Sequence, residues 1–357
     1  MSHRILRIVL YERKPSPSTP TDSDNRNSDD VYVLGTEQTL AALLKSFFVL
    51  RRLSRYDLIT TSEYFSSFGL NLRLLLTGCR AKHVVIGLNQ SRWLLRTGFP
   101  PLDFLINLVF RRSNLVVVHS RKEISQFSEL HKIPEDRFYF SLWGYDLPPS
   151  APAQFSRWPR PYVCLVGRNN RDLVTFFRAC DGMPVDGIVI TSNYEPLPVE
   201  VPPNVFVFRE LPQNETLDCI KNAFANLILL KDDKRGAGHI TAVSAMLSGS
   251  PIIKTDADAI EDYLINGVSA IGVSLEDAEG ARSAIKSLID APHLAARLSS
   301  NAKAYAQRWL THEASSQRIN AALERVRRDE RFAIVDAEWL KAYEGLKASS
   351  KMTFAVV

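Results

Sequence analysis

The sequence predicts an α/β protein made of two Rossmann-like, doubly wound domains in tandem. Short apolar runs alternate with amphipathic segments twice along the chain, which is the pattern of strands and helices in parallel sheets. The 357 residues exceed what one hydrophobic core usually supports. A stretch with five prolines, 148–161, separates the two series and indicates a linker. We therefore expect an N-terminal domain at 1–149, a linker at 150–161, a C-terminal domain at 162–330, and a tail or helix at 331–357 with the option of packing back on the N-terminal domain.

The first series contains six expected strands and a long polar insertion. Residues 14–30 are rich in Pro, Ser and Asp, so we expect a disordered loop there. Ser120 precedes a helical segment and is expected to cap it. The predicted strands are 4–11, 31–34, 57–61, 83–86, 115–118 and 138–142, and the predicted helices are 36–55, 65–76, 102–112 and 120–130.

The second series repeats the alternation and ends in three consecutive helices. The predicted strands are 162–166, 187–191, 204–208, 226–230, 251–255 and 269–273, and the predicted helices include 239–247, 278–289, 295–310 and 313–328.

Composition and charge restrict the function classes. Residues 1–150 hold 20 basic and 14 acidic residues, or +6, which exceeds the net charge of +5 for the whole chain. This excess indicates an anionic partner for the first half, such as a phosphate-bearing acceptor or a lipid surface. Nucleic acid is disfavoured, because no zinc-finger, RRM or KH signature accompanies the scattered basic residues. The four cysteines are widely spaced without a CxxC pair, so we expect reduced thiols.

Membrane contact is expected to be peripheral at most. No apolar run reaches the ~18 residues of a membrane span, and no signal peptide opens the sequence, so a cytoplasmic location is expected. Residues 40–55 combine apolar pairs with Arg51, Arg52 and Arg55, a pattern that suits an anionic membrane surface. Covering the sheet is the alternative role of this helix. Of the pair Phe47 and Phe48, packing needs one ring while the other points outward.

A strand, loop, helix and strand at 226–255 form the centre of the predicted site. The loop contains Gly236 and Gly238, and His239 and Thr241 open the helix. Glycines let the backbone approach a phosphate, and a helix N-terminus offers N–H groups to an anion. The imidazole and the threonine hydroxyl can also donate to phosphate oxygens.

A second loop, after the strand 162–166, carries Gly167, Arg168 and Arg171. Two arginines in one short loop can clamp a phosphate through paired donors, although a loop arginine is more often solvated. Both loops follow strands of one predicted sheet, and ligands bind at the carboxyl ends of such strands. The sequence therefore predicts a diphosphate site in the second domain.

Three segments resemble a large group of retaining GT-B glycosyltransferases usually called family four or group one. The matching segments are 116–146, 162–180 and 238–273. The resemblance extends over 4–330 and implies two Rossmann-like domains facing each other across a cleft. It also implies a nucleotide-sugar donor on the second domain and no cofactor.

The sequence departs from this family at two positions. The family usually has two glutamates separated by seven residues, the second just before an Ala-Met pair. Aligned on Ala245 and Met246, these positions hold Gly236 and Ser244. In the family the first glutamate is associated with the transferred sugar and the second with the donor ribose, so donor identity and stereochemical course stay open. Some members have a Gly-Gln-x-Thr loop instead, in which case His239 takes the position of Gln.

Candidate catalytic or acceptor-binding residues in the first domain are Glu63, Asn89 and His119, because each follows a predicted strand. Of these, His119 is expected to be a capping or packing residue rather than a catalytic one. Asp232 and Asp233 are adjacent, and neighbouring side chains in a loop diverge. We expect a solvated loop there and no metal site.

The sequence thus predicts a glycosyltransferase that moves a hexose-type sugar from a UDP- or GDP-linked donor to a glycan or lipid-linked acceptor. The expected context is polysaccharide or cell-envelope glycan synthesis, with retention as the default course. The alternative is a non-catalytic, GT-B-like nucleotide-sugar-binding or scaffold partner of another transferase. The missing glutamates favour the alternative, whereas the intact glycines and arginines disfavour it.

Overall fold

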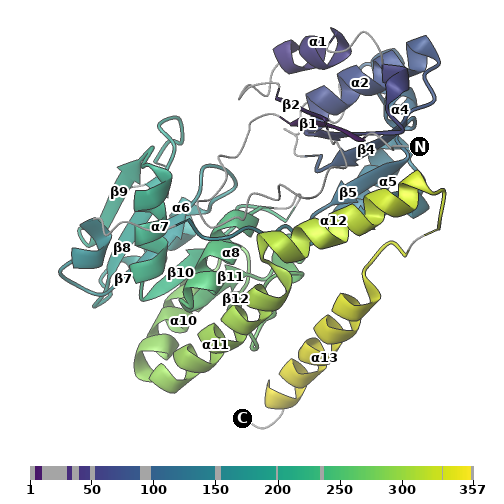
Figure 1. Cartoon of the computed structure of the whole chain (residues 1–357). Coiled ribbons are helices and arrows are strands. Elements are labelled where there is room, and N and C mark those ends of the chain that lie inside the picture. The colour runs from purple at the N-terminus through teal and green to yellow at the C-terminus, as the bar shows by residue number, and fades with distance from the viewer. Residues whose placement is uncertain are drawn as a thin grey trace. The chain divides into compact units, whose positions relative to one another are not determined.

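The computed structural model describes residues 5–9, 30–33, 40–48, 53–88, 98–148, 154–197, 200–233, 237–331 and 333–354. The chain forms two compact units (Figure 1). Unit 1 comprises Met1–Ser141 and Gln317–Asp336, and unit 2 comprises Leu142–Ser316 and Ala337–Val357. Each unit is built on one six-stranded sheet of parallel strands, which confirms the predicted α/β class.

Unit 1 has the strand order β2-β1-β3-β4-β5-β6. The strand order changes direction between β1 and β3, so the crevice of this doubly wound sheet opens at their carboxyl ends. Its elements are β1 (Ile5–Val9), β2 (Asp30–Val33), α1 (Leu40–Phe48), η1 (Leu53–Arg55), β3 (Leu58–Ser62), α2 (Tyr64–Thr77), β4 (Lys82–Ile86), α4 (Pro100–Phe110), β5 (Leu115–Val118), α5 (Lys122–His131), η2 (Glu135–Arg137) and β6 (Phe138–Phe140).

Unit 2 has the strand order β12-β11-β10-β7-β8-β9, with its change of direction between β7 and β10. Apolar residues of α6 and α10 pack on the sheet to form its core. Its elements are η3 (Gln154–Arg157), β7 (Tyr162–Val166), α6 (Leu173–Cys180), β8 (Asp186–Thr191), β9 (Val205–Arg209), α7 (Gln213–Asn222), β10 (Ala225–Ile228), α8 (His239–Ser248), β11 (Ile252–Thr255), α9 (Asp258–Glu261), β12 (Ile271–Val273), α10 (Ala278–Asp290), α11 (Pro292–Trp309), α12 (His312–Arg327) and α13 (Ala337–Phe354).

Residues 317–336 belong to unit 1, although the sequence placed 162–330 in one domain. The second half of α12 packs Leu323 and Val326 against the apolar side chains of β3, β4 and β5. Lys82 Nζ donates to the carbonyls of Val326 and Arg327, both at 2.9 Å, where a cation complements the helix dipole. Because of these long-range contacts, the second half of α12 belongs to unit 1.

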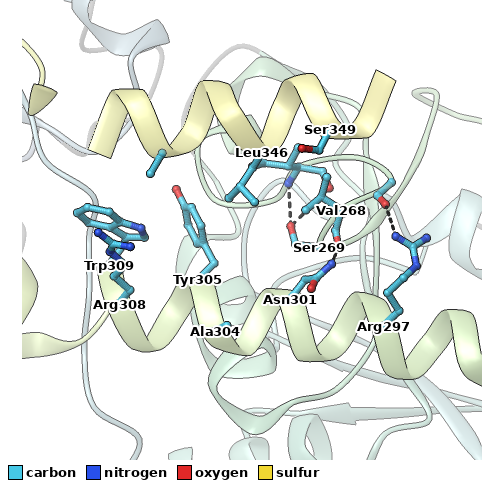
Figure 2. A pocket seen from close by; sticks show the side chains of 13 residues that line it. Val268, Ser269, Arg297, Asn301, Ala304, Tyr305, Arg308, Trp309, Leu346 and Ser349 are labelled. Atoms are coloured by element: carbon cyan, nitrogen blue, oxygen red, sulfur yellow. Dashed lines mark hydrogen bonds between the residues drawn. The ribbon is translucent and has the colours of Figure 1, made fainter. Parts of the chain in front are cut away.

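The predicted tail at 331–357 divides between the units: its start belongs to unit 1, where the N–H of Phe140 donates to the carbonyl of Ile334 at 2.8 Å, and helix α13 belongs to unit 2. Trp339 is fully buried, and its indole N–H donates to the hydroxyl of Tyr305 at 2.7 Å. Further along, the two helices α11 and α13 leave a cavity of about 460 Å³ beside Leu346 (Figure 2). Helix α13 is therefore held mainly at its first turns and by the ion pair between Lys347 and Glu261.

Two local predictions change in the structure. The helix expected at 36–55 is described only as α1 and η1, and most of the loop expected at 14–30 lies outside the described residues. Ser120 does not cap α5, because its hydroxyl has no hydrogen-bond partner in the described part of the chain. The Glu123 carboxylate instead accepts from the backbone N–H groups of His119 and Ser120, which precede the helix, at 3.1 and 3.2 Å. The four cysteines form no disulfide in the structure.

One buried imidazole makes the stability of unit 1 depend on pH. His131 is fully buried against Tyr64, Phe110 and Phe127, and neither ring nitrogen has a hydrogen-bond partner among the described residues. Burial lowers the pKa of His131 from 6.5 to about 4. The folded protein therefore binds this proton less tightly than the unfolded chain does.

We predict that His131→Phe flattens the acid limb of the unfolding curve of unit 1. In the wild type, the stability tied to the neutral imidazole is complete above pH 6.5 and is lost as the pH falls toward 4, with a slope of up to about 1.4 kcal/mol per pH unit. Urea unfolding followed by hydrogen exchange of unit 1 peptides measures this slope. The exposed His293 supplies the control, His293→Phe, and an unchanged slope in His131→Phe would contradict the argument.

Candidate functional site

The two predicted phosphate loops flank the change of strand order in unit 2. Gly167 follows β7, and Gly238 is the N-terminal cap of α8, the helix after β10. Gly238 has φ 86°, and a Cβ there would come within 2.8 Å of Ile228, so glycine is required. The N-terminus of α8 is thereby aimed at the carboxyl edge of the sheet.

Arg171 contacts both loops with one buried side chain. Its side chain is buried, and its guanidinium donates to the carbonyls of Val166 and Asn169 at 2.9 and 3.0 Å. Its Nη2 lies 3.4 Å from the Thr241 hydroxyl on α8. A Cβ on Gly167 would lie 2.5 Å from the guanidinium, so only glycine at this position leaves room for the arginine side chain. Arg171 positions the loops and does not line the cavity above them.

Arg168 is the exposed arginine of the same loop. Its guanidinium pairs with the Glu210 carboxylate at 3.0 Å, with about two thirds of its side chain accessible to solvent. Glu210 follows β9 with φ 49°, an unusual conformation for a residue with a side chain, and it also accepts from the backbone N–H of Asn193. A surface ion pair of this kind is weak, so an incoming anion can compete for Arg168.

Four of the predicted binding residues line one cavity of about 210 Å³. These are Gly167, Arg168, Thr241 and Ser244. Residues of β7, β8, α7 and α8, the segment after β9 and one tyrosine complete its walls: Tyr145, Val166, Ile190, Thr191, Glu210, Leu211, Gln213, Thr216, Leu217, Ile220 and Ile240. The cavity therefore combines a cation, a helix N-terminus and an apolar side, which is the lining that a nucleoside diphosphate needs.

The remaining predicted binding residues lie elsewhere. The His239 imidazole stacks on Tyr263 with ring centroids 4.4 Å apart, and its Nε2 lies 3.0 Å from the carbonyl of Ala259. It thus faces α9 and not the cavity. Gly236 lies outside the described residues.

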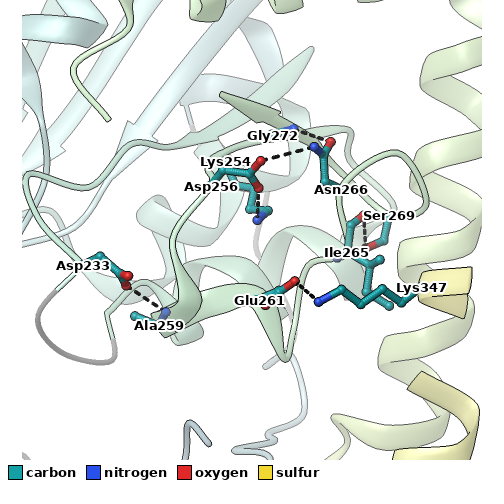
Figure 3. Close-up of polar contacts among 10 residues, drawn as sticks. All are labelled: Asp233, Lys254, Asp256, Ala259, Glu261, Ile265, Asn266, Ser269, Gly272 and Lys347. Carbon is teal, nitrogen blue, oxygen red and sulfur yellow. Dashed lines mark hydrogen bonds and ion pairs between the residues drawn. The ribbon is translucent and has the colours of Figure 1, made fainter. Parts of the chain in front are cut away.

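The neighbouring acidic loop is partly ordered by a backbone contact. Asp233 accepts from the N–H of Ala259 at 2.9 Å, and Asp256 pairs with buried Lys254 at 2.6 Å (Figure 3). Asp233 is therefore not simply solvated. Within the described ranges, no group of three or more His, Cys, Asp or Glu side chains is placed to hold a metal ion.

Sequence reasoning missed Tyr145, which contacts the site from far along the chain. Its hydroxyl lies 2.5 Å from the Ser244 hydroxyl, and both side chains are buried beside the cavity. Ser244 also donates to the carbonyl of Ile240 at 2.7 Å, so the Tyr145 hydroxyl is the donor to Ser244. Tyr145 lies in one of the segments that carry the family resemblance, but no local pattern identifies it as a partner of Ser244.

In unit 1, Glu63 stands where the strand order changes, directly after β3. Its backbone has φ 72° and ψ 160°, a region almost restricted to glycine, which costs on the order of 1–3 kcal/mol. Its Oε2 is buried with no hydrogen-bond partner in the described chain. Desolvation raises the pKa of Glu63 to about 7. A strained backbone and an unsatisfied carboxyl at a sheet crevice are typical of functional residues.

A chain of buried polar side chains holds the backbone of Glu63. Ser67 Oγ lies 2.5 Å from the Glu63 carbonyl and 2.8 Å from Thr61 Oγ1, so these two acceptors share its proton, and Thr61 Oγ1 lies 2.8 Å from His83 Nε2. His83 Nδ1 lies 2.7 Å from Asn71 Oδ1, an acceptor, so the proton is on Nδ1 and Nε2 accepts from Thr61. Burial lowers the pKa of His83 to about 3, which keeps this ring neutral.

The other two candidates of unit 1, His119 and Asn89, show fewer features of a functional residue. His119 follows β5 and its Nδ1 lies 2.8 Å from the carbonyl of Ser141; burial lowers its pKa. A Cβ on Gly87 would lie 3.6 Å from its Nε2, so the ring packs against backbone. Asn89 lies outside the described residues.

Comparison with solved structures identifies the fold as that of GT-B glycosyltransferases. Sucrose-phosphate synthase from Thermosynechococcus elongatus aligns with a TM-score of 0.68 and 15% identity over 91% of this chain and 99% of that chain. HepE from Anabaena in complex with UDP aligns with a TM-score of 0.68 and 15% identity, covering 90% of this chain and 99% of that chain. The UDP-forming α,α-trehalose-phosphate synthase from Burkholderia xenovorans, in complex with glucose-6-phosphate, gives a TM-score of 0.58 and 12% identity over 80% and 78%.

Searches of protein-family models and of curated proteins found no match to the sequence. The structural likeness confirms the predicted fold class, because all three neighbours align over most of both chains.

We predict that Arg171→Met and Arg168→Met differ sharply in their effect on unit 2. Loss of the buried guanidinium leaves the carbonyls of Val166 and Asn169 without their donor, which we expect to lower the free energy of unfolding by about 2–4 kcal/mol. Loss of the exposed Arg168 should cost less than about 0.5 kcal/mol. Urea unfolding monitored by hydrogen exchange of β7 and α8 peptides tests this, and equal losses in both variants would refute the division of roles.

We also predict that Glu63→Gln stabilises unit 1 above pH 7. A carboxyl with a folded pKa of about 7 and an unfolded pKa of 4.5 contributes stability that is complete below pH 4.5 and lost as the pH rises through 7. Glutamine avoids this loss, so the variant should gain up to about 3 kcal/mol at alkaline pH. Unfolding at several pH values measures the gain. The matched control is Glu135→Gln at an exposed position of η2, and a Glu63→Gln variant no more stable than wild type would show that the carboxyl is not desolvated.

Proposed function

We propose that the chain is a nucleotide-sugar-dependent glycosyltransferase whose donor binds in unit 2. The observation that carries this proposal is the cavity at the β7–β10 edge, where Arg168 and the first turn of α8 line one space. The Thr241 hydroxyl itself donates to the carbonyl of Val166 at 3.2 Å. The GT-B fold supports the proposal, because this fold class is shared with glycosyltransferases of known identity.

The chemistry follows from charge development on the leaving diphosphate. When the sugar–phosphate bond breaks, negative charge grows on the phosphate oxygens, and preorganised donors stabilise that charge. Arg168 supplies a cation after leaving Glu210, and the first turn of α8 supplies N–H groups without intrahelical partners. Arg171 keeps these donors in register through its bonds to both loops.

We propose a UDP-linked hexose as the donor. HepE from Anabaena has been solved with UDP and with UDP-glucose, which supports uridine over guanosine among the two bases considered. The apolar walls of the cavity, from Ile190, Leu211 and Leu217, suit the face of a base. Retention remains the default course, because the donor phosphate itself can assist the incoming hydroxyl in the family that the sequence resembles.

On the acceptor side we propose Glu63 as the residue that binds the attacking hydroxyl. Its buried carboxyl has room for one hydrogen bond, and an acceptor hydroxyl can supply it. A carboxyl with a pKa of about 7 can take up a proton near neutral pH. The proposed acceptor is a glycan or lipid-linked saccharide of polysaccharide or cell-envelope synthesis, used in the cytoplasm.

We predict that Arg168→Ala weakens UDP binding about ten- to a hundredfold, since a charged hydrogen bond contributes about 1.5–3 kcal/mol. Isothermal titration calorimetry of the full chain with UDP, and with GDP for comparison, measures this. The control is Arg157→Ala, an exposed arginine of η3, which should leave affinity unchanged.

Unchanged affinity in Arg168→Ala, or no binding of either nucleotide to the wild type, would remove the site. A wild type that binds UDP but releases none from UDP-glucose with any lipid-linked acceptor would favour the scaffold alternative.

A further inference from the structure

Helix α4 is apolar on both of its faces. Its sequence, PPLDFLINLVF, contains one charged residue in eleven. Ile106, Val109 and Phe110 are buried in unit 1, as a helix that covers a sheet requires. The opposite face exposes Phe104 and Leu108, which are four residues apart. Leu102 and Leu105 are also exposed, and Phe99 precedes them at the N-cap. A surface helix normally has polar side chains on the face that points to water, and α4 has exposed apolar side chains there instead.

The exposure is large and concentrated. Phe104 is 69% exposed and Phe99 is 60% exposed. Isolated exposed apolar side chains are normal, but a cluster of them marks an interaction surface. Of the fourteen large apolar side chains that are exposed in the described chain, nine lie between residues 44 and 108, and five of these belong to α4 and its N-cap. The patch is thus a property of one helical region.

Two neighbouring helices of unit 1 add further exposed apolar side chains. Helix α1 packs on α2, and α2 packs on α4 (Figure 1). Helix α1 exposes Leu44 and Phe48, the latter at 72%, whereas Phe47 is partly buried. The end of α2 exposes Leu75 and Leu76. The adjacent phenylalanines of α1 therefore divide between packing and exposure.

The same region has a strong positive charge. Residues 40–112 contain eleven Lys and Arg against three Asp and Glu, a difference of +8, whereas the whole chain has +5. Arg111 follows α4 directly and is exposed, one turn beyond Leu108 on the helix. Cations beside exposed apolar side chains match the boundary of an anionic bilayer, where acyl chains and phosphates lie within a few ångströms of each other.

We propose that α4 inserts its Phe104 and Leu108 face into the headgroup boundary of an anionic membrane, with α1 as a secondary contact. Eleven residues extend about 16 Å, against about 30 Å for the hydrocarbon core, so the helix lies in the interface. No helix in the described ranges is long and apolar enough to cross a bilayer. The charge is spread over several helices and loops, which suits an extended anionic surface better than a single acidic peptide. The proposal does not depend on the donor site of unit 2.

The test is co-sedimentation of the full chain with phosphatidylcholine vesicles, with and without phosphatidylglycerol, at low and high salt. We expect binding to the anionic vesicles that weakens with salt. Phe104→Ser combined with Leu108→Ser should reduce partitioning at least about tenfold. Both side chains are largely exposed, at 69% and 42%, so folding is retained. The matched control combines Tyr194→Ser and Leu275→Ser in unit 2, with 71% and 41% exposure, and should bind like the wild type.

Several outcomes would overturn the proposal. Equal binding to neutral vesicles would show that anionic lipid is not required. Partitioning of the α4 variant at the wild-type level would show that α4 does not contact the membrane. If Leu44→Ser with Phe48→Ser abolished binding while the α4 variant did not, α1 would be the membrane element. If the wild type bound no vesicles but formed a dimer in solution, and the α4 variant were monomeric, this face would be an interface with a second copy of the chain. UDP affinity should be unchanged in every variant, which separates this test from that of the donor site.

Discussion

The site of unit 2 depends on the hydrogen bonds of one buried guanidinium, that of Arg171. Arg171 binds the carbonyls at the end of β7 and contacts the Thr241 hydroxyl on α8, so one side chain fixes the distance between the two loops. It occupies the space that any Cβ on Gly167 would need. A charged group this deeply buried is stable only with its acceptors in place, which makes the local arrangement all-or-none. Arg168 is left as the cation that solvent and ligand reach.

The departure from the resembling family also has a structural reason. At the position of the second family glutamate the chain has Ser244, and the Tyr145 hydroxyl donates to it from 99 residues away. Because the two hydroxyl oxygens lie 2.5 Å apart and both side chains are buried, the longer side chain of a glutamate at this position would need the space of the tyrosine hydroxyl. The pair leaves hydrogen-bonding groups beside the cavity without a second negative charge. Among the lining residues of the cavity, Glu210 is the carboxylate, and it is already paired with Arg168.

Strands and loops could be predicted from the sequence because their signals are local. The unbroken apolar runs of β5 and β7 identify central parallel strands, and Gly167 and Gly238 mark the loops that follow β7 and β10. The role of Arg171 could not be predicted, since a loop arginine has the same sequence pattern whether it is solvated or buried. The division of α12 between the units, and the pairing of Tyr145 with Ser244, depend on contacts between distant segments.

Both units place their distinctive residues at the same topological position, although their strand orders differ. In unit 2 the change of direction between β7 and β10 brings together a cation and a helix N-terminus, which favour an anion. In unit 1 the change between β1 and β3 presents Glu63, whose Oε2 is buried and whose strained backbone has its carbonyl bound by Ser67. The environment of Glu63 disfavours its charged form, so an anion gains nothing there, whereas a hydroxyl can supply the missing hydrogen bond. The two crevices thus differ in the charge that they favour, and this difference supports the proposal that the diphosphate binds in unit 2 and an acceptor hydroxyl in unit 1.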